Sequence, residues 1–147
     1  MDLLKKFLGR KKQERAAPFC TAVIVAAGTA SRMQGIDKIL CPMGNYPLLL
    51  YTLIPFQNSD SVDEIVIVDT GSADATRRIA QTYTDRVYDF TWIDDFSAAR
   101  NFAFSKATCE YIYSADADEV LSEENRARFQ VLKETLLPEI EIVQMKY

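Results

Sequence analysis

Short apolar runs rich in β-branched residues alternate along this chain with longer segments whose apolar residues recur at helical spacing. The runs TAVIVAAG and EIVIVD are the clearest of the first kind, and a polar turn follows each of them. The pattern predicts strands at 21–28, 64–69, 86–90, 110–118 and 139–147, and helices at 46–59, 73–84, 96–108 and 122–137. This alternation predicts one three-layer α/β domain with a mostly parallel sheet.

Several residues mark the expected ends of the helices. Asp74 is well placed to cap the second helix, and Ser122 followed by two glutamates is a capping signature for the last one. Asp94 and Asp95 are interpreted as an N-cap pair for the third helix. Pro55 is expected to end or kink the first helix, because proline has no amide hydrogen to donate.

Charge is distributed unevenly along the 147 residues, which carry a net charge of −4. Residues 1–17 contain six Lys or Arg against two acidic residues, so we expect 1–18 to be a flexible basic extension and 19–147 a single acidic domain. The apolar run of the extension is too short for a signal peptide, and no stretch reaches the roughly 18 apolar residues of a spanning helix. We therefore expect a cytoplasmic protein without a transmembrane segment, and the acidic body argues against a nucleic-acid partner.

Histidine is absent from the sequence, which excludes Ser-His and Cys-His nucleophiles and histidine-metal sites. Cys20, Cys41 and Cys109 follow no CxxC spacing, so neither a disulfide framework nor a zinc site is indicated. Catalysis would have to use carboxylates, Arg, Lys, backbone amides or a bound ion.

The loop AAGTASRMQGIDK, residues 26–38, follows the first predicted strand and suits a polyphosphate. Small residues and Gly28 let backbone amides approach phosphate closely, and Arg32 and Lys38 supply positive charge for its oxygens. The alternative interpretation is that both side chains are surface charges beside an ordinary turn.

Residues 20–68, which contain this loop, resemble the opening of the cytidylyltransferases that activate methylerythritol phosphate in isoprenoid synthesis. The resemblance implies that CTP is the ligand and that Arg32 and Lys38 are catalytic cations, which stabilise charge on its α-phosphate. It also implies a nucleotide cradle that includes Ala26, Ala27, Gly28 and Ser31.

A second resemblance rests on the phrases VDTGSADAT, WIDDFSAARNFAFSKAT and ADADEV. Residues 67–129, which contain them, are similar to family 2 glycosyltransferases, inverting enzymes that use nucleotide-sugar donors such as UDP-sugars. The resemblance implies that Asp69 contacts the nucleoside, and that Asp116 and Asp118 hold the divalent ion that bridges the donor diphosphate. Arg100 would contact either the diphosphate or the acidic turn.

The residue types in the Asp-x-Asp phrase suit Mg²⁺ or Mn²⁺. Both ions prefer oxygen ligands, and Mg²⁺ usually takes only one or two carboxylates beside substrate phosphates and water. The alternative for Asp116 and Asp118 is a solvated acidic turn.

Both resemblances imply the same GT-A, nucleotide-diphospho-sugar transferase architecture, so the chain is interpreted as a chimera whose parts meet at strand 64–69. Three hypotheses stay open: a nucleotide-sugar glycosyltransferase or its donor-binding part, a cytidylyltransferase, and a catalytically inactive folded chimera. The glycosyltransferase resemblance implies an acceptor site and its general base in a region beyond the one that residues 67–147 match, so we expect an incomplete acceptor site. The final predicted strand, EIEIVQMKY, would leave a β-prone sheet edge that favours a homodimer.

Overall fold

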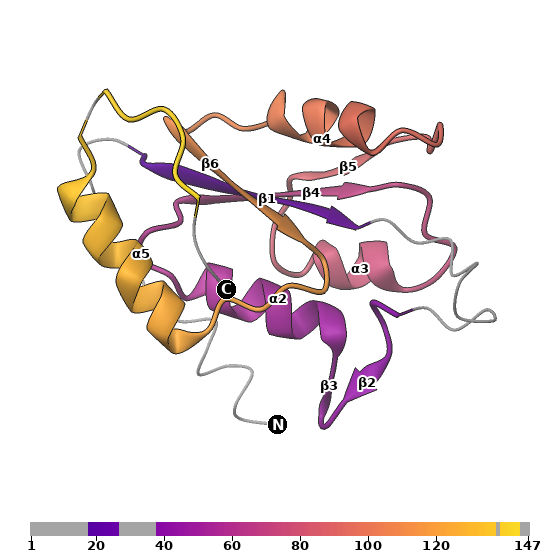
Figure 1. Cartoon of the computed structure of the whole chain (residues 1–147). Helices are drawn as coiled ribbons and strands as arrows, with labels where there is room; N and C mark the ends of the chain where they lie inside the picture. The colour runs from indigo at the N-terminus through magenta and orange to yellow at the C-terminus, as the bar shows by residue number, and fades with distance from the viewer. Residues whose placement is uncertain (1–17, 27–37, 138, 145–147) are drawn as a thin grey trace.

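The computed structural model describes residues 18–26, 38–137 and 139–144. A four-stranded, wholly parallel sheet lies at its centre in the order β5-β4-β1-β6 (Figure 1). The strands are β1 (Cys20–Ala26), β4 (Glu64–Asp69), β5 (Val87–Asp89) and β6 (Tyr111–Asp116). All seven residues of β1 are buried, as expected for a central strand covered on both faces.

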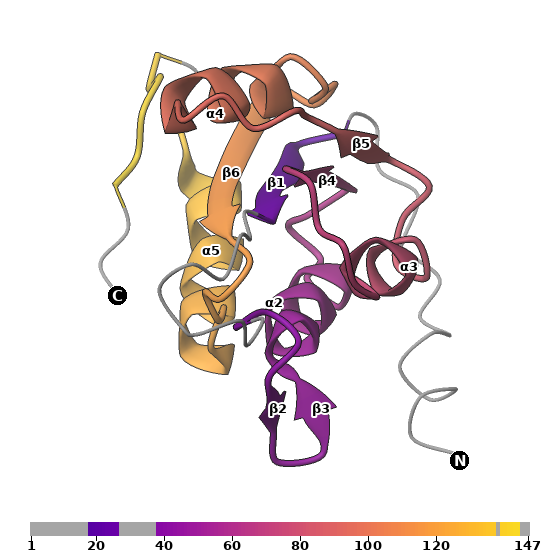
Figure 2. The ribbon, with the colours of Figure 1, turned by 90° about the vertical axis from the view of Figure 1, so that its right-hand side faces the viewer.

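Helices cover both faces of the sheet, which gives three layers (Figure 2). On one face, α4 (Phe96–Phe104) packs Ala99 and Ala103 against valines of β1 and β4. The other face carries α2 (Leu48–Gln57), α3 (Thr76–Ala80) and α5 (Glu123–Thr135). The predicted three-layer α/β arrangement is therefore confirmed.

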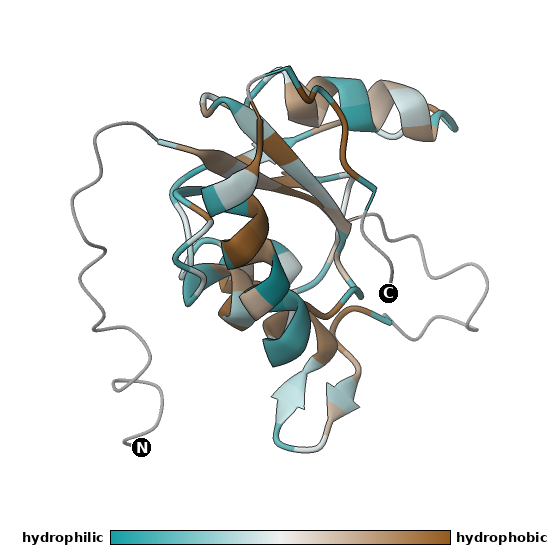
Figure 3. Cartoon of the chain, turned by 60° about the vertical axis from the view of Figure 1, so that its left-hand side comes forward, coloured by the Kyte–Doolittle hydropathy of each residue, from teal (hydrophilic) through white to brown (hydrophobic). Residues whose placement is uncertain are grey.

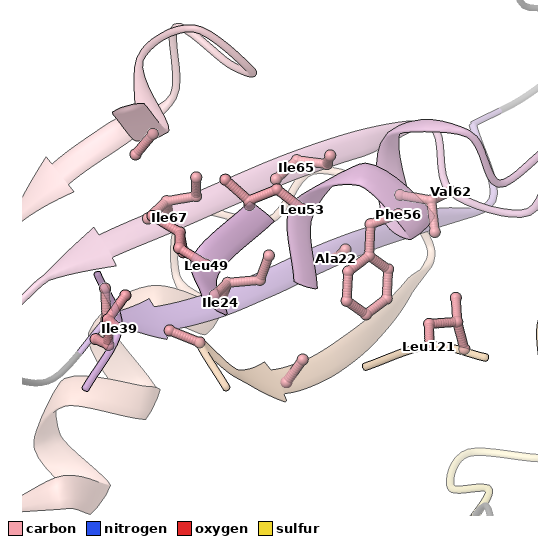
Figure 4. Close-up of a cluster of buried hydrophobic side chains, with 14 of the residues drawn as sticks. Ala22, Ile24, Ile39, Leu49, Leu53, Phe56, Val62, Ile65, Ile67 and Leu121 are labelled. Atoms are coloured by element: carbon pink, nitrogen blue, oxygen red, sulfur yellow. The ribbon is translucent and has the colours of Figure 1, made fainter. Parts of the chain in front are cut away.

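The larger part of the core lies between α2 and the sheet (Figure 4). Leu49, Leu53 and Phe56 of the helix are at most 1% exposed and pack with Ile24 of β1 and Ile67 of β4. Each such side chain contributes about 1.5–3 kcal/mol by leaving water. Colouring by hydropathy shows the apolar strands running between the two helical layers (Figure 3). None of the described helices is long and apolar enough to cross a membrane.

Two of the predicted caps are confirmed. The carboxylate of Asp95 accepts from the Ala98 amide at 3.0 Å, and the Ser122 hydroxyl accepts from the Asn125 amide at 3.1 Å. Asp74 accepts from the Thr76 amide at 2.7 Å but does not cap α3, because the N-cap residue is Ala75 and no side chain caps this helix. Asp94 is not part of a cap pair: it has a left-handed backbone with φ of 58°, and its carboxylate accepts from the Trp92 indole at 2.9 Å.

Two helices differ in length from the prediction. Residues 73–84 were expected to be helical, but α3 spans only Thr76–Ala80. The chain leaves the helix in tight turns, where the Thr82 hydroxyl donates to the Ile79 carbonyl at 2.7 Å, a local bond that competes with helix continuation. Pro55 does not end α2, which continues to Gln57, less than one turn further.

The strands also differ from the prediction in two places. A short antiparallel hairpin, β2 (Pro42–Met43) and β3 (Tyr46–Pro47), precedes α2 and was not predicted. The closing strand expected at 139–147 is wrong as far as the structure describes it, because residues 139–144 form no strand. A homodimer was expected because this strand would leave an exposed sheet edge, so that expectation no longer has a structural basis.

A polar cluster ties the amino-terminal edge of the sheet together. The Glu64 carboxylate accepts from the Thr21 hydroxyl at 2.7 Å and from the Thr108 amide and hydroxyl at 3.1 and 3.0 Å. Glu64 also pairs with Arg86, which in turn donates to the Lys106 carbonyl. One carboxylate thus links β1, β4, the start of β5 and the loop that leads to β6.

Candidate functional site

The candidate site lies at the carboxyl edge of the sheet, where the loops after β1, β4 and β6 begin. The strand register aligns Ala26 with Asp69 on one side of β1 and Val25 with Asp116 on the other. Asp69 and Asp116 therefore flank the end of β1, two strand spacings or about 10 Å apart. Ligands of open parallel sheets bind beyond this edge, so the fold brings both predicted residues to the expected place.

Asp69 at the end of β4 shapes the loop that follows it. The residue is 4% exposed, and its Oδ1 accepts from the amides of Gly71 and Ser72 at 3.2 and 2.8 Å. Gly71 has φ of +108°, a conformation that residues with a side chain rarely adopt. Thr70 then joins this loop to β1, because its amide donates to the Ala26 carbonyl at 3.1 Å.

The acidic turn after β6, Asp116 to Glu119, is held by its backbone. The Asp116 amide donates to Oε2 of Glu119 at 3.0 Å, and the Glu119 amide donates back to the Asp116 carbonyl at 3.0 Å. The buried Thr52 hydroxyl of α2 donates to the Ala117 carbonyl, also at 3.0 Å. These bonds fix the turn without using the carboxylates of Asp116 and Asp118.

Each of those two carboxylates is paired with a cation. Arg100 of α4 donates to Oδ1 of Asp116 at 2.9 Å, and both side chains are about half exposed. Of the two contacts considered for Arg100, the structure thus shows the one with the acidic turn. The Lys38 ammonium pairs with Oδ2 of Asp118, and its pKa is raised because it donates a hydrogen bond to that carboxylate and feels its charge.

One residue of the predicted nucleotide cradle, Ala26, lies within the described residues. Ala26 closes β1, and its carbonyl accepts the Thr70 amide and hydroxyl. The other predicted cradle and catalytic residues of the loop lie outside the described residues: Ala27, Gly28, Ser31 and Arg32.

The carboxylates of Asp116 and Asp118 suit a metal ion whose remaining ligands come from a bound phosphate and water. Among residues 18–26, 38–137 and 139–144, no group of three or more His, Cys, Asp or Glu side chains is placed to hold a metal ion. Asp116 and Asp118 supply two accessible carboxylates, with side chains 50% and 34% exposed. Two carboxylates fit Mg²⁺ or Mn²⁺, which take further oxygens from phosphate and water.

Sequence reasoning missed one supporting residue, Thr52, and the contact between Lys38 and Asp118. Thr52 carried a signal, because a hydroxyl in the apolar run LLLYTLIPF needs a buried partner. The Lys38 contact joins residues 80 positions apart, so no local pattern indicates it.

The family model described as "Glycosyl transferase family 2" matches residues 48–130, more than half of the chain. Its match begins at α2, inside the segment that resembles cytidylyltransferases, and ends in α5. It therefore includes Asp69, Arg100, Asp116 and Asp118.

Curated relatives of two kinds match parts of the chain. A 2-C-methyl-D-erythritol 4-phosphate cytidylyltransferase of Dehalococcoides mccartyi is 51% identical over 47 residues, 32% of this chain and 21% of that protein. The prophage-derived glycosyltransferase SunS of Bacillus subtilis is 38% identical over 71 residues, 47% of this chain and 17% of that protein. A TPR repeat-containing protein of Synechococcus elongatus is 48% identical over 62 residues, 42% of this chain and 15% of that protein. The chain thus matches about a fifth or less of the length of each.

Solved structures support the fold. Rv0371c of Mycobacterium tuberculosis superposes with a TM-score of 0.65 at 22% identity, over 79% of this chain and 60% of that one. A nucleotidyl transferase of Methanothermobacter superposes with a TM-score of 0.61 at 23% identity, over 80% and 57%. Rv0371c was also solved in complex with manganese, with a TM-score of 0.57 at 18% identity over 81% and 60%. The fold is that of the Rossmann-like nucleotide-diphospho-sugar transferases.

Proposed function

This chain belongs to glycosyl transferase family 2, and from that premise we propose that its domain binds a nucleoside diphosphate sugar with the help of a divalent metal. The whole protein would use this donor to transfer the sugar to an acceptor. The observation that carries the proposal is the register of the sheet, which brings Asp69 and Asp116 to either side of the end of β1.

Asp69 is the candidate for the nucleoside. Its Oδ1 is engaged by the amides of Gly71 and Ser72, so a base or ribose contact would use Oδ2. Because the loop bonds hold the carboxylate in place before any ligand arrives, little side-chain freedom would be lost on binding.

Asp116 and Asp118 are the candidates for the diphosphate end of the donor. They would hold Mg²⁺ or Mn²⁺, an ion that neutralises the charge of a leaving nucleoside diphosphate when it is bound. Arg100 and Lys38 lie against these carboxylates, and both carry donors that suit phosphate oxygens. The bonds from Thr52 and Glu119 keep the backbone of the turn in place while its side chains change partners.

A cytidylyltransferase-type site for CTP is the second candidate. One observation favours it: Lys38, a cation expected from that resemblance, lies at the same edge of the sheet as the acidic turn. Arg32 would be the second catalytic cation, with Ala26, Ala27, Gly28 and Ser31 around the phosphates.

Calorimetric titration with a UDP-sugar and with CTP, each with and without Mn²⁺, separates these functions. Under the main proposal, UDP-sugar binding requires Mn²⁺ and weakens at least about tenfold in Asp118→Ala. Asp60→Ala is the matched control, because Asp60 is exposed and precedes β4 at the opposite edge of the sheet.

Two other outcomes would contradict the main proposal. Binding of CTP that is lost in Arg32→Ala but kept in Asp118→Ala would support the cytidylyltransferase-type site. A folded chain that binds neither nucleotide would be a catalytically inactive chimera.

A further inference from the structure

Lys38 and Asp118 come from the two different family-like segments of the chain, yet they form an ion pair inside the candidate site. Lys38 stands in the segment that resembles cytidylyltransferases, and Asp118 closes the Asp-x-Asp phrase of the segment that resembles glycosyltransferases. Each was expected to bind a different part of a ligand, one a phosphate and the other a metal. In the structure they pair with each other.

The backbones of both residues are anchored, so their meeting is a property of the fold. Ile39, directly after Lys38, is 6% exposed in the core, and its carbonyl accepts from the Leu49 amide of α2 at 2.9 Å. On the other side, the Thr52 bond to the Ala117 carbonyl places the acidic turn against the same helix. Only the side chains of Lys38 and Asp118 are left to exchange partners.

A cation in contact with Asp118 opposes metal binding in two ways. The ammonium uses a carboxylate oxygen that a metal needs as a ligand, and its positive charge repels a divalent ion nearby. The pair is largely accessible to water, with side chains 59% and 34% exposed, so the opposition is modest and reversible.

We propose that Lys38 is the resident counter-ion of Asp118 and leaves it for a nucleotide phosphate, so that nucleotide and divalent metal bind cooperatively. Without nucleotide, the metal must displace Lys38. With nucleotide bound, the phosphate takes over Lys38 and Asp118 is open to the metal. The cooperative part rests on the proposed nucleotide function, whereas the competition between Lys38 and the metal does not. By reciprocity, the metal strengthens nucleotide binding by the same factor.

Mn²⁺ titration followed by electron paramagnetic resonance, which counts free Mn²⁺, tests the competition on the full chain without nucleotide. Lys38→Met should bind Mn²⁺ about three- to tenfold more tightly than the wild type, the range expected for losing an exposed pair and a nearby like charge. Lys133→Met is the matched control: it removes the same charge beside the Asp60 carbonyl, at the opposite edge of the sheet, and should leave Mn²⁺ affinity unchanged. The tighter binding should vanish in the double variant Lys38→Met with Asp118→Ala.

Repeating the titration with saturating UDP tests the coupling. UDP should increase the Mn²⁺ affinity of Lys38→Met less than it increases that of the wild type. The difference should equal the factor by which Lys38→Met alone tightens Mn²⁺ binding. The proposal that Lys38 is the counter-ion of Asp118 would be overturned if Lys38→Met bound Mn²⁺ no more tightly than the wild type, or if neither protein bound Mn²⁺. If Lys38→Met binds Mn²⁺ more tightly but UDP binds neither protein, the competition between Lys38 and the metal is supported, whereas the coupling and the proposed function are both refuted.

Discussion

Removing the Glu64 carboxylate should destabilise the fold more than removing any surface acid. The side chain is only 15% exposed and accepts three hydrogen bonds of 2.7–3.1 Å from Thr21 and Thr108, besides its pair with Arg86. Hydrogen bonds to a charged group contribute about 1.5–3 kcal/mol each, but bonds that share one carboxylate do not add. Breaking a buried pair from one side costs about 3–5 kcal/mol.

The cost of Glu64→Ala should fall at the lower end of that range. Arg86 is 29% exposed and keeps its bond to the Lys106 carbonyl, so its charge is not stranded. We expect a loss of about 3 kcal/mol in the free energy of unfolding. For a domain of this size the melting temperature should fall by about 10 °C. Glu64→Gln, which keeps one acceptor oxygen, should lose about half as much.

Urea denaturation followed by far-ultraviolet circular dichroism measures these losses, and an unchanged denaturant slope would show that the unfolded state is not altered. Glu124→Ala is the control, because Glu124 forms an exposed i,i+4 pair with Arg128 on α5 and should cost less than about 0.5 kcal/mol. A cost for Glu64→Ala no greater than that of this control would show that the Glu64 carboxylate does not stabilise this edge of the sheet.

Four further predictions test other parts of the fold. Burial raises the pKa of the Cys20 thiol to about 12, against 9.0 unfolded, so folding stability should fall as pH rises from about 9 towards 12. Urea midpoints measured across that range should show this fall, and Cys20→Ala should make it smaller without abolishing it, because burial also raises the pKa of Tyr83. A thiol reagent at pH 8 should label Cys41 and Cys109 before unfolding and Cys20 only after it, since Cys20 is 1% exposed. Gly71→Ala should cost about 1–2 kcal/mol through backbone strain alone, because an added Cβ meets no atom within 4 Å; a neutral thermal melt would contradict this. Ser122→Ala removes the cap of α5 and should cost about 1 kcal/mol in urea titration, whereas no loss would show that the cap bond is not made in solution.

The sequence predicts the parts of the site that depend on strands with a clear pattern. Asp69 and Asp116 were placed correctly because each ends an apolar strand, and parallel strands end at one edge of a sheet. The closing strand was wrong because alternation is only a tendency: a strand forms when a partner accepts its backbone bonds, and residues 139–144 have no such ladder. The hairpin β2–β3 was missed because two-residue strands show no period. The cytoplasmic location stays a prediction.

The contacts that complete the site are long-range and could not be read from local pattern. The bonds Lys38–Asp118 and Thr52–Ala117 each cross from the first segment of the chain to the acidic turn. Such contacts depend on where two anchored backbones come to lie, which follows from the packing of α2 and not from the residues at either end.

The packing explains how segments with different resemblances can share one core. β1, from the part that resembles cytidylyltransferases, lies between β4 and β6 and pairs with both, so the acidic turn and the Asp69 loop are positioned against the same strand. The match to the glycosyl transferase model begins at α2, whose Leu49, Leu53 and Phe56 fill the space under β1 and β4 alike. A nucleotide bound at the end of β1 would therefore meet Lys38 from one segment, and Arg100 and the carboxylates from the other. Because those groups already pair with each other, phosphate and metal would, under the proposed function, have to separate these pairs as they bind.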